Sequence, residues 1–225
     1  MDFPSLRAFV MEKMLNGLYV ITDDQLCPGR THVEIARAAI EGGARIIQMR
    51  DKSASDREFY ESALAIRQLC TEADALFFVN DRAHIAAAVG ADGVNVGQTD
   101  LPISAVRAIL GPKAIIGVSC DNIEQAVQAE LDGADYVGFG PVFPTSTKLD
   151  AGPVSGLETL RLVCARVALP VVAIGGIGAS NIAEVAAAGA ACAAVVSAIV
   201  RAPDMTTATI DLIRRFGSRR DNREK

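Results

Sequence analysis

The sequence contains no tryptophan, only two histidines and no apolar run of membrane-spanning length. The missing run excludes a transmembrane helix, and residues 1–13 lack the basic start and apolar stretch of a secretory signal peptide. We therefore expect a soluble, cytoplasmic protein that does not engage a membrane. His32 and His84 fall where helices should begin or run, not at strand ends, which disfavours a histidine acid–base mechanism.

Basic charge is also scarce, with 22 Lys and Arg against 27 Asp and Glu and a net charge of −5. This balance gives no general attraction for nucleic acid, so any anion must be bound locally. The five cysteines are odd in number and scattered, and no C-x-x-C pair marks a zinc or redox site. Free thiols in a reducing cytosol are the favoured interpretation. The nucleophile elbow, the Walker A sequence and the dinucleotide fingerprint are absent from the contexts they require.

What the chain does contain is a repeated alternation of short apolar runs and amphipathic segments. Half of its residues are apolar and only 5% are aromatic, which favours helices packed closely on a buried parallel sheet. The runs are rich in β-branched residues and occur at residues 18–21, 46–49, 76–79, 94–96, 114–118, 136–139, 171–174 and 193–196. Each is continuous enough for a strand that is covered on both faces.

Helix starts are marked between these runs. Capping boxes are predicted at Thr31, Ser55 and Ser155, with weaker versions at Asn122 and Asn181. Eight strand and helix units without a linker predict a closed (β/α)8 TIM barrel, and not an open doubly wound sheet. We expect one catalytic domain over residues 1–217, with an extra N-terminal helix near residues 5–15, and a disordered charged tail over residues 218–225.

In such barrels the chemistry lies at the C-terminal ends of the strands. After the second run, Gln48 and Arg50 should share one face at the mouth, and Lys52 follows where the loop begins. The alternative is a loop in which Arg50 or Lys52 only pairs with Asp51.

Carboxylates follow the third and fourth runs, at Asp81 and Asp100. Magnesium is usually held by one or two carboxylates, waters and the phosphates of the substrate, so this pair forms a credible half-site. The alternative for each is a helix cap.

Three further loops suit an anion. Residues 145–148 bring three hydroxyls and a lysine, Gly175-Gly176 follow the seventh run, and Ser197 follows the eighth. Loops after strands seven and eight of these barrels often bind phosphate through backbone N–H groups. A solvated turn, a tight glycine turn and a plain N-cap are the respective alternatives. Together the strand ends carry more anion-binding groups than one monophosphate requires. A magnesium-bridged diphosphate and a second phosphorylated ligand would use all of these groups.

These residues resemble the thiamine phosphate synthase (thiamine-phosphate pyrophosphorylase) family over residues 17–199. The matching segments are QMRDK (48–52), VNDR (79–82), ADG (91–93), GQTD (97–100), GVS (117–119), FPTSTK (143–148), AIGGI (173–177) and VVS (195–197). The chain departs from the family at Asn95 and at Cys120-Asp121, where the family often has histidine and Thr-His.

The resemblance implies an aryl or alkyl transferase, EC 2.5.1.3. It would join an aminopyrimidine, supplied as its diphosphate, to a (carboxylated) hydroxyethylthiazole phosphate, giving thiamine phosphate and pyrophosphate. One Mg²⁺ per active site would lie on Asp81 and Asp100. The pyrimidine diphosphate would contact Gln48, Met49, Arg50, Asp51, Lys52, Asn80, Ser119 and Lys148, of which Arg50, Lys52, Ser119 and Lys148 are the catalytic candidates. The thiazole phosphate would contact Thr145, Ser146, Thr147, Gly175, Gly176, Val196 and Ser197.

The family mechanism is a dissociative substitution, in which the diphosphate leaves first and the electron-rich pyrimidine stabilises the methylene cation. Two alternatives stay open: a thiazole tautomerase-like relative, which should need a histidine near strand five, and a non-catalytic regulator that binds the same ligands. The expected partners are small phosphorylated molecules, and the sequence does not determine the oligomeric state.

Overall fold

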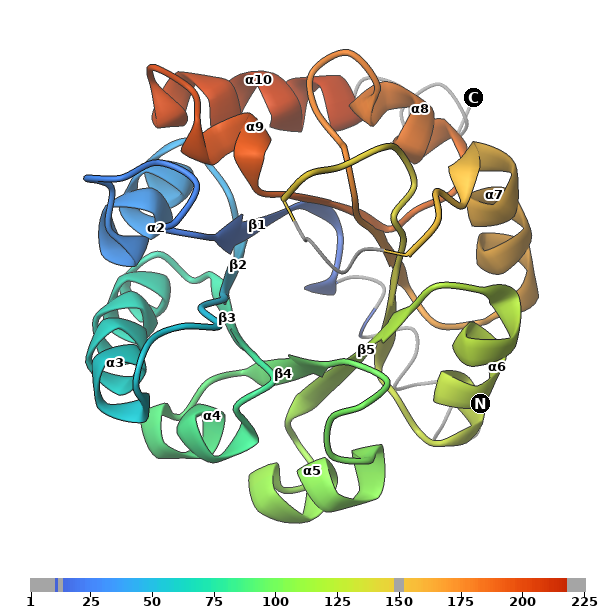
Figure 1. The fold of residues 1–225 in the computed structure, drawn as a ribbon, viewed down its shortest axis with the longest axis horizontal. Helices are drawn as coiled ribbons and strands as arrows, with labels where there is room; N and C mark the ends of the chain where they lie inside the picture. The colour runs from blue at the N-terminus through green and yellow to red at the C-terminus, as the bar shows by residue number, and fades with distance from the viewer. Residues whose placement is uncertain (1–10, 12–13, 148–151, 218–225) are drawn as a thin grey trace.

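The computed structural model describes residues 11, 14–147 and 152–217 of the 225-residue chain. Eight strands, all paired in parallel, close into one barrel in the order of the chain (Figure 1). They are β1 (Gly17–Thr22), β2 (Ile46–Met49), β3 (Leu76–Asn80), β4 (Gly93–Val96), β5 (Ile115–Cys120), β6 (Tyr136–Phe139), β7 (Val171–Ala173) and β8 (Cys192–Val195). Pairing of Gly17 in β1 with Cys192 in β8 closes the ring. The predicted (β/α)8 barrel is therefore confirmed.

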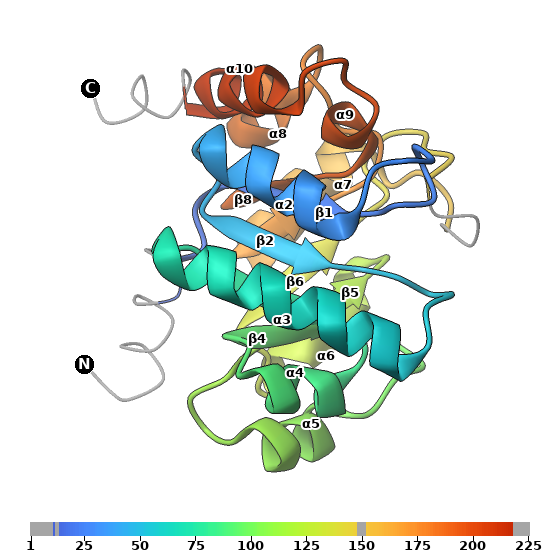
Figure 2. The ribbon, with the colours of Figure 1, turned by 90° about the vertical axis from the view of Figure 1, so that its left-hand side faces the viewer.

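Helices surround the barrel as an outer ring (Figure 1). Within the described residues they are α2 (His32–Glu41), α3 (Asp56–Glu72), α4 (Ala83–Val89), α5 (Ile103–Leu110), α6 (Ile123–Leu131), α7 (Gly156–Arg166), α8 (Ile182–Ala187), α9 (Ser197–Val200) and α10 (Met205–Gly217). Figure 2 shows the loops that follow β1, β2 and β6 gathered at one end of the barrel, to which the strand arrows point. The predicted N-terminal helix and charged tail lie largely or wholly outside the described residues.

The apolar side chains form two layers, as the period of two along each strand requires. Outward residues such as Ile47 and Val137 pack against the helices, and inward residues such as Ile46 and Phe78 fill the barrel. Leu15, just before β1, is fully buried in the inner layer. This closes the N-terminal end of the barrel and leaves polar residues for the opposite end.

The helix-start predictions are confirmed only in part. Thr31 and Ser55 form complete capping boxes, and Asn122 accepts from the Gln125 amide at 2.9 Å. The box at Ser155 is wrong, because that residue has helical dihedral angles and its hydroxyl contacts the Asp121 carbonyl at 3.3 Å. The cap at Asn181 is also wrong, since its side chain bonds the preceding loop instead of the helix.

Candidate active site

Two adjoining cavities occupy the C-terminal end of the barrel. The first, here the carboxylate pocket, is lined by two tyrosines, by apolar residues such as Val172, and by the polar residues Gln48, Arg50, Lys52, Asn80, Asp81, Asn95, Gln98, Thr99, Asp100, Ser119 and Asp121. The second, here the glycine pocket, is lined by Thr145, Thr147, Gly175, Gly176, Val196 and Ser197 among others. Seven residues line both: Ile21, Arg50, Ser119, Asp121, Gly138, Ile174 and Ala194. The cavities therefore share a wall.

β2 supplies the first polar residues of the carboxylate pocket. Gln48 is buried and points inward, where its amide nitrogen donates to the Tyr19 hydroxyl at 2.7 Å. Met49, the next residue, points outward and is buried between the barrel and the helices. Met49 lines neither cavity, so the predicted contact of Met49 with a ligand is not seen.

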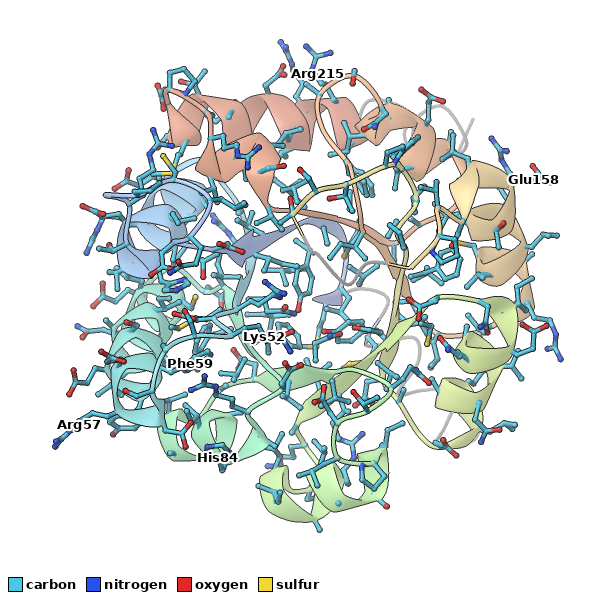
Figure 3. All side chains as sticks on the ribbon, viewed as in Figure 1. Lys52, Arg57, Phe59, His84, Glu158 and Arg215 are labelled. Atoms are coloured by element: carbon cyan, nitrogen blue, oxygen red, sulfur yellow. The ribbon has the colours of Figure 1, made fainter. Side chains whose placement is uncertain are left out.

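The two cations of this loop pair with carboxylates from other strands. Arg50 contacts Asp23 at 3.4 Å, and Asp23 in turn accepts from the backbone of the β1 loop. Lys52 pairs with Asp81 across the mouth. Figure 3 shows Lys52 near the centre of the mouth, whereas Arg57, Glu158 and Arg215 lie on the periphery. The alternative, in which Arg50 or Lys52 only pairs with Asp51, is therefore wrong.

Asp51 is turned away from both cavities. Burial alone would raise its pKa, but hydrogen bonds from the Ala54 and Ser53 amides, the Ser53 hydroxyl and His32 lower that pKa to about 2. The amide distances are 2.9 Å for Ala54 and 2.7 Å for Ser53. The Asp51 carboxylate thus shapes the loop that presents Arg50 and Lys52.

Asp81 and Asp100 meet at the opposite wall of the carboxylate pocket. Neither caps a helix, since the N-cap positions of α4 and α5 are Arg82 and Pro102 and neither helix has a side-chain cap. Burial raises the pKa of Asp81 above its ordinary value, the Lys52 ammonium lowers that pKa, and the neighbouring Asp100 carboxylate raises it again. Asp100 accepts from the Gly97 amide at 2.7 Å. Two adjacent oxygen donors in a polar cavity fit a hard divalent cation.

Ser119 stands in the wall between the cavities. Its hydroxyl accepts from the Asn95 amide nitrogen at 2.9 Å, so the hydroxyl hydrogen stays available for an anion. Asn95 is the residue at which the sequence departs from the family's histidine. Asn80 lines the same cavity from the end of β3.

The other departure, Cys120-Asp121, lines the glycine pocket. Burial raises the pKa of the Cys120 thiol to about 12, with a smaller contribution from the Asp121 charge. The thiol therefore stays protonated at neutral pH and does not act as a base there.

Residues 145–147 bring hydroxyls to the glycine pocket. Thr145 and Thr147 line it, and the Thr147 amide donates to the Thr145 hydroxyl at 3.2 Å. The Ser146 side chain is exposed and outside the lining. Lys148 lies outside the described residues. Two of the three predicted hydroxyls thus face a cavity, which favours the anion-binding interpretation over a solvated turn.

Gly175 and Gly176 are required by their backbone and their neighbours. Their φ angles are +99° and +64°, and a Cβ would lie 2.6 Å from Pro141 at Gly175 and 2.4 Å from the Pro144 oxygen at Gly176. Asn181 holds this loop by donating to the Gly176 carbonyl at 2.9 Å and accepting from the Gly178 amide at 2.8 Å. The loop is therefore fixed closely against residues 141–144.

α9 provides the last wall of the glycine pocket. Ser197 is its first helical residue, so the plain N-cap interpretation of Ser197 is wrong. At the other end of α9, Arg30 donates to the Val200 and Ala202 carbonyls at 2.5 and 2.7 Å. A short extra helix after β8 beside a glycine loop after β7 is the usual phosphate site of this fold.

Sequence reasoning missed the inward residues that lie deeper than the strand ends. Tyr19, Tyr136 and Asn95 line the carboxylate pocket from within the strands, before the loops begin. Tyr19 lies two residues before Ile21, and Tyr136 two residues before Gly138, so each pair shares the inward face of its strand; this spacing was the signal that could have identified the tyrosines. A separate group, Asp24, His32 and Asp51, also offers clustered ligand atoms, but Asp24, His32 and Asp51 line neither cavity. No helix among the described residues is long and apolar enough to cross a membrane.

The fold and the paired cavities define a (β/α)8-barrel enzyme with its chemistry at the C-terminal ends of the strands. A family model described as thiamine monophosphate synthase matches residues 18–199. A thiamine-phosphate synthase of Methanospirillum hungatei is 52% identical over 86% of this chain and 94% of its own length, and one of Chloroflexus aurantiacus is 49% identical over 87% and 90%. The solved structure of thiamine phosphate pyrophosphorylase from Pyrococcus furiosus has a TM-score of 0.84 at 47% identity, covering 93% of this chain and 98% of that one. The chain belongs to the thiamine-phosphate synthase family, whose members are transferases.

Proposed function

We propose that this enzyme condenses 4-amino-2-methyl-5-(diphosphooxymethyl)pyrimidine with a (carboxylated) hydroxyethylthiazole phosphate, releasing pyrophosphate and forming thiamine phosphate. The observation that carries the proposal is the pair of cavities with a shared wall. One cavity offers cations and adjacent carboxylates, and the other offers glycine amides and hydroxyls. Two differently charged substrates would thus meet at Arg50 and Ser119, which line both.

In this proposal the enzyme positions the substrates and neutralises the leaving group. Arg50, Lys52 and the Ser119 hydroxyl donate to the diphosphate, together with Lys148, and Asn80 and Gln48 complete its pocket. Preorganised donors of this kind contribute about 3 kcal/mol each to the stability of a transition state. One magnesium ion, when held by Asp81 and Asp100 with the substrate phosphates, adds positive charge where the diphosphate departs.

The thiazole phosphate would occupy the glycine pocket. The amides of Gly175, Gly176 and Ser197 and the hydroxyls of Thr145 and Thr147 would supply donors without a fixed positive charge. A neutral cradle suits this substrate, because its nitrogen must attack a developing cation at the shared wall. Binding both reactants side by side converts a bimolecular step into an effectively unimolecular one.

Two other functions are less well supported. A thiazole tautomerase-like activity should need a histidine near β5, but both histidines of the chain lie within the described residues and neither lines a cavity. A non-catalytic regulator would leave the pairing of Lys52 with Asp81 beside Asp100 unexplained. We also propose a reducing, cytoplasmic setting, supported by the five cysteines, all free in the structure.

The test is to incubate the purified chain with both substrates and Mg²⁺ and to measure pyrophosphate and thiamine phosphate. The expected result is equal release of both products, and none when either substrate is omitted. Thiazole isomerisation without pyrophosphate would indicate the tautomerase, and binding without any turnover would indicate the regulator. Either result would refute the proposed reaction.

A further inference from the structure

Arg82 directly follows Asp81 in the turn after β3, and no role proposed above uses it. Its side chain is only 18% exposed. Although Arg82 stands at the N-cap position of α4, its side chain makes no cap bond there and contacts the loop after β2 instead. A charged group with so little access to water needs specific partners, and each partner of this guanidinium can be named.

The loop after β2 supplies two of these partners. The Nη2 atom of Arg82 donates to the Ala54 carbonyl at 2.6 Å and to the Asp51 carbonyl at 3.4 Å. These carbonyls stand on either side of Lys52 in the chain. The guanidinium of Arg82 therefore holds the backbone from which Lys52 extends.

α3 supplies the other two partners. The Nη1 atom of Arg82 donates to the Asp56 carboxylate at 3.0 Å, and the guanidinium carbon lies 4.6 Å from the centroid of the Phe59 ring (Figure 3). Asp56 is 68% exposed, so this ion pair alone would contribute little. Phe59 is fully buried, and its ring gives the planar cation a fixed surface.

The backbone that carries Asp81 has an uncommon conformation. Asp81 has a φ of +60°, and the Arg82 amide donates to the Asn80 carbonyl, two residues back, at 2.7 Å. A turn this tight with a positive φ is rare at a residue with a side chain, and it persists only where the neighbours fix it. The Asp81 amide donates to the Asn95 carbonyl at 2.8 Å, which holds one side of the turn. The Arg82 side chain holds the other side.

We propose that Arg82 is a positioning residue for the diphosphate and its metal, because its guanidinium sets the distance between Lys52 and Asp81. The inference rests on the proposed function, which assigns these two groups to the departing diphosphate and to magnesium. One planar cation is bonded to the carbonyls on both sides of Lys52 and belongs to the residue after Asp81. It therefore couples the two loops without contacting either substrate.

Lysine could not take the place of Arg82. The guanidinium donates in several directions from one rigid plane, whereas an ammonium is a point charge that cannot reproduce this fork. In Arg82→Lys the loop after β2 would keep the hydrogen bonds within it but lose its fixed place opposite Asp81. Misplacing a positioned group by about 1 Å costs about a hundredfold in rate. The effect should be confined to the diphosphate, because Arg82 contacts no residue that lines the glycine pocket alone.

The test compares Arg82→Lys and Arg82→Gln with a matched control, Arg67→Lys. Arg67 also extends from the α3 side of the barrel, is 25% exposed and bonds a carboxylate of another element, Asp92, which precedes β4 at the opposite end of the barrel. The measurements are thermal unfolding, hydrogen exchange of residues 51–56 in the metal-free protein, calorimetric binding of magnesium pyrophosphate, and kinetics with each substrate varied in turn.

In Arg82→Lys, exchange of residues 51–56 should quicken about tenfold, because the loop is no longer held from outside. Binding of magnesium pyrophosphate should weaken about tenfold, and kcat/KM for the pyrimidine diphosphate should fall about a hundredfold. The KM of the thiazole phosphate should stay within about threefold of the wild-type value. Arg82→Gln should show the same pattern with a larger loss of stability. Arg67→Lys should unfold at a lower temperature and leave exchange, affinity and kinetics unchanged.

An Arg82→Lys protein that loses stability but keeps the wild-type exchange, affinity and kinetics would overturn the inference, since Arg82 would then only support the fold. Equal losses in Arg67→Lys would overturn it as well. If Arg82→Gln does not fold, Arg82→Lys decides alone. A wild type that binds magnesium pyrophosphate in an Arg82-dependent manner but forms no thiamine phosphate would support the inference and refute only the proposed reaction.

Discussion

The carboxylate pocket and the glycine pocket are built from different groups, although they share a wall. The first uses charged side chains, with Lys52 paired to Asp81 beside Asp100. The second is lined by Gly175 and Gly176 and by the hydroxyl-bearing residues Thr145 and Thr147. In the proposed reaction, negative charge grows on the departing diphosphate and positive side chains would stabilise it, whereas the backbone dipoles of a glycine loop would be enough to hold a monophosphate that does not react.

This contrast predicts that a single charge is decisive in the carboxylate pocket. Asp81→Asn keeps the shape of the side chain but removes one of two adjacent anionic oxygen donors. We expect kcat/KM to fall about a thousandfold and the magnesium concentration needed for half-maximal rate to rise. The neutral amide would hold the metal more weakly, and less positive charge would then stabilise the departing diphosphate. The measurement is pyrophosphate release across a magnesium titration.

Asp132→Asn, at the exposed end of α6, is the matched control and should behave as wild type. If Asp81→Asn shows the wild-type magnesium dependence, the metal assignment to Asp81 and Asp100 is wrong.

In the glycine pocket, backbone shape should matter more than charge. Gly176→Ala places a Cβ 2.4 Å from the Pro144 oxygen at a φ of +64°. The loop must move, and we expect the KM of the thiazole phosphate to rise about a hundredfold while that of the pyrimidine diphosphate changes little. Steady-state kinetics with each substrate varied in turn will measure the split.

Gly178→Ala is the matched control on the same loop, since its Cβ would meet nothing closer than 3.9 Å. An equal rise of both KM values in Gly176→Ala would show that the two pockets do not act as separate subsites.

In the loop after β2, a substitution at Asp51 should change the stability of the fold and not the chemistry of the site. Asp51→Asn removes a carboxylate whose pKa is lowered to about 2 from 3.8, so its charge stabilises the folded state above pH 4. We expect the free energy of unfolding at pH 7 to fall by about 2 kcal/mol. The difference from wild type should vanish as the pH falls through 2, because the wild-type carboxylate is then protonated in both states.

Denaturant unfolding at pH 7, 4 and 2.5 measures this. A gap between wild type and variant that stays constant over this range would mean that the Asp51 charge is not its cause.

The barrel could be predicted almost completely from the sequence. Its strands, with outward residues such as Val20, Ile47 and Val137, are covered on both faces and therefore appear as continuous apolar runs. Most residues predicted at the strand ends line one of the two cavities, because strand ends of a closed barrel converge, but Met49, Asp51 and Ser146 line neither.

Which neighbour each residue contacts could not be predicted. Asp51 follows Arg50 directly but turns to the Ser53 and Ala54 amides, and Asn181 matches a cap pattern but bonds the glycine loop. Which hydrogen-bond partner a side chain takes depends on the three-dimensional path of the backbone, which the spacing of residues in the sequence does not determine.

The shared wall also has a consequence for inhibitor design. Gly138 lines both cavities and has no side chain to separate them. A single molecule that joins a diphosphate mimic to a phosphate mimic, with a short linker passing Gly138, would bring its second anion to the other cavity at high effective concentration. The association constant of the joined molecule should then approach the product of the two separate association constants and this effective concentration, and the linker length that binds best would report the distance between the two anions.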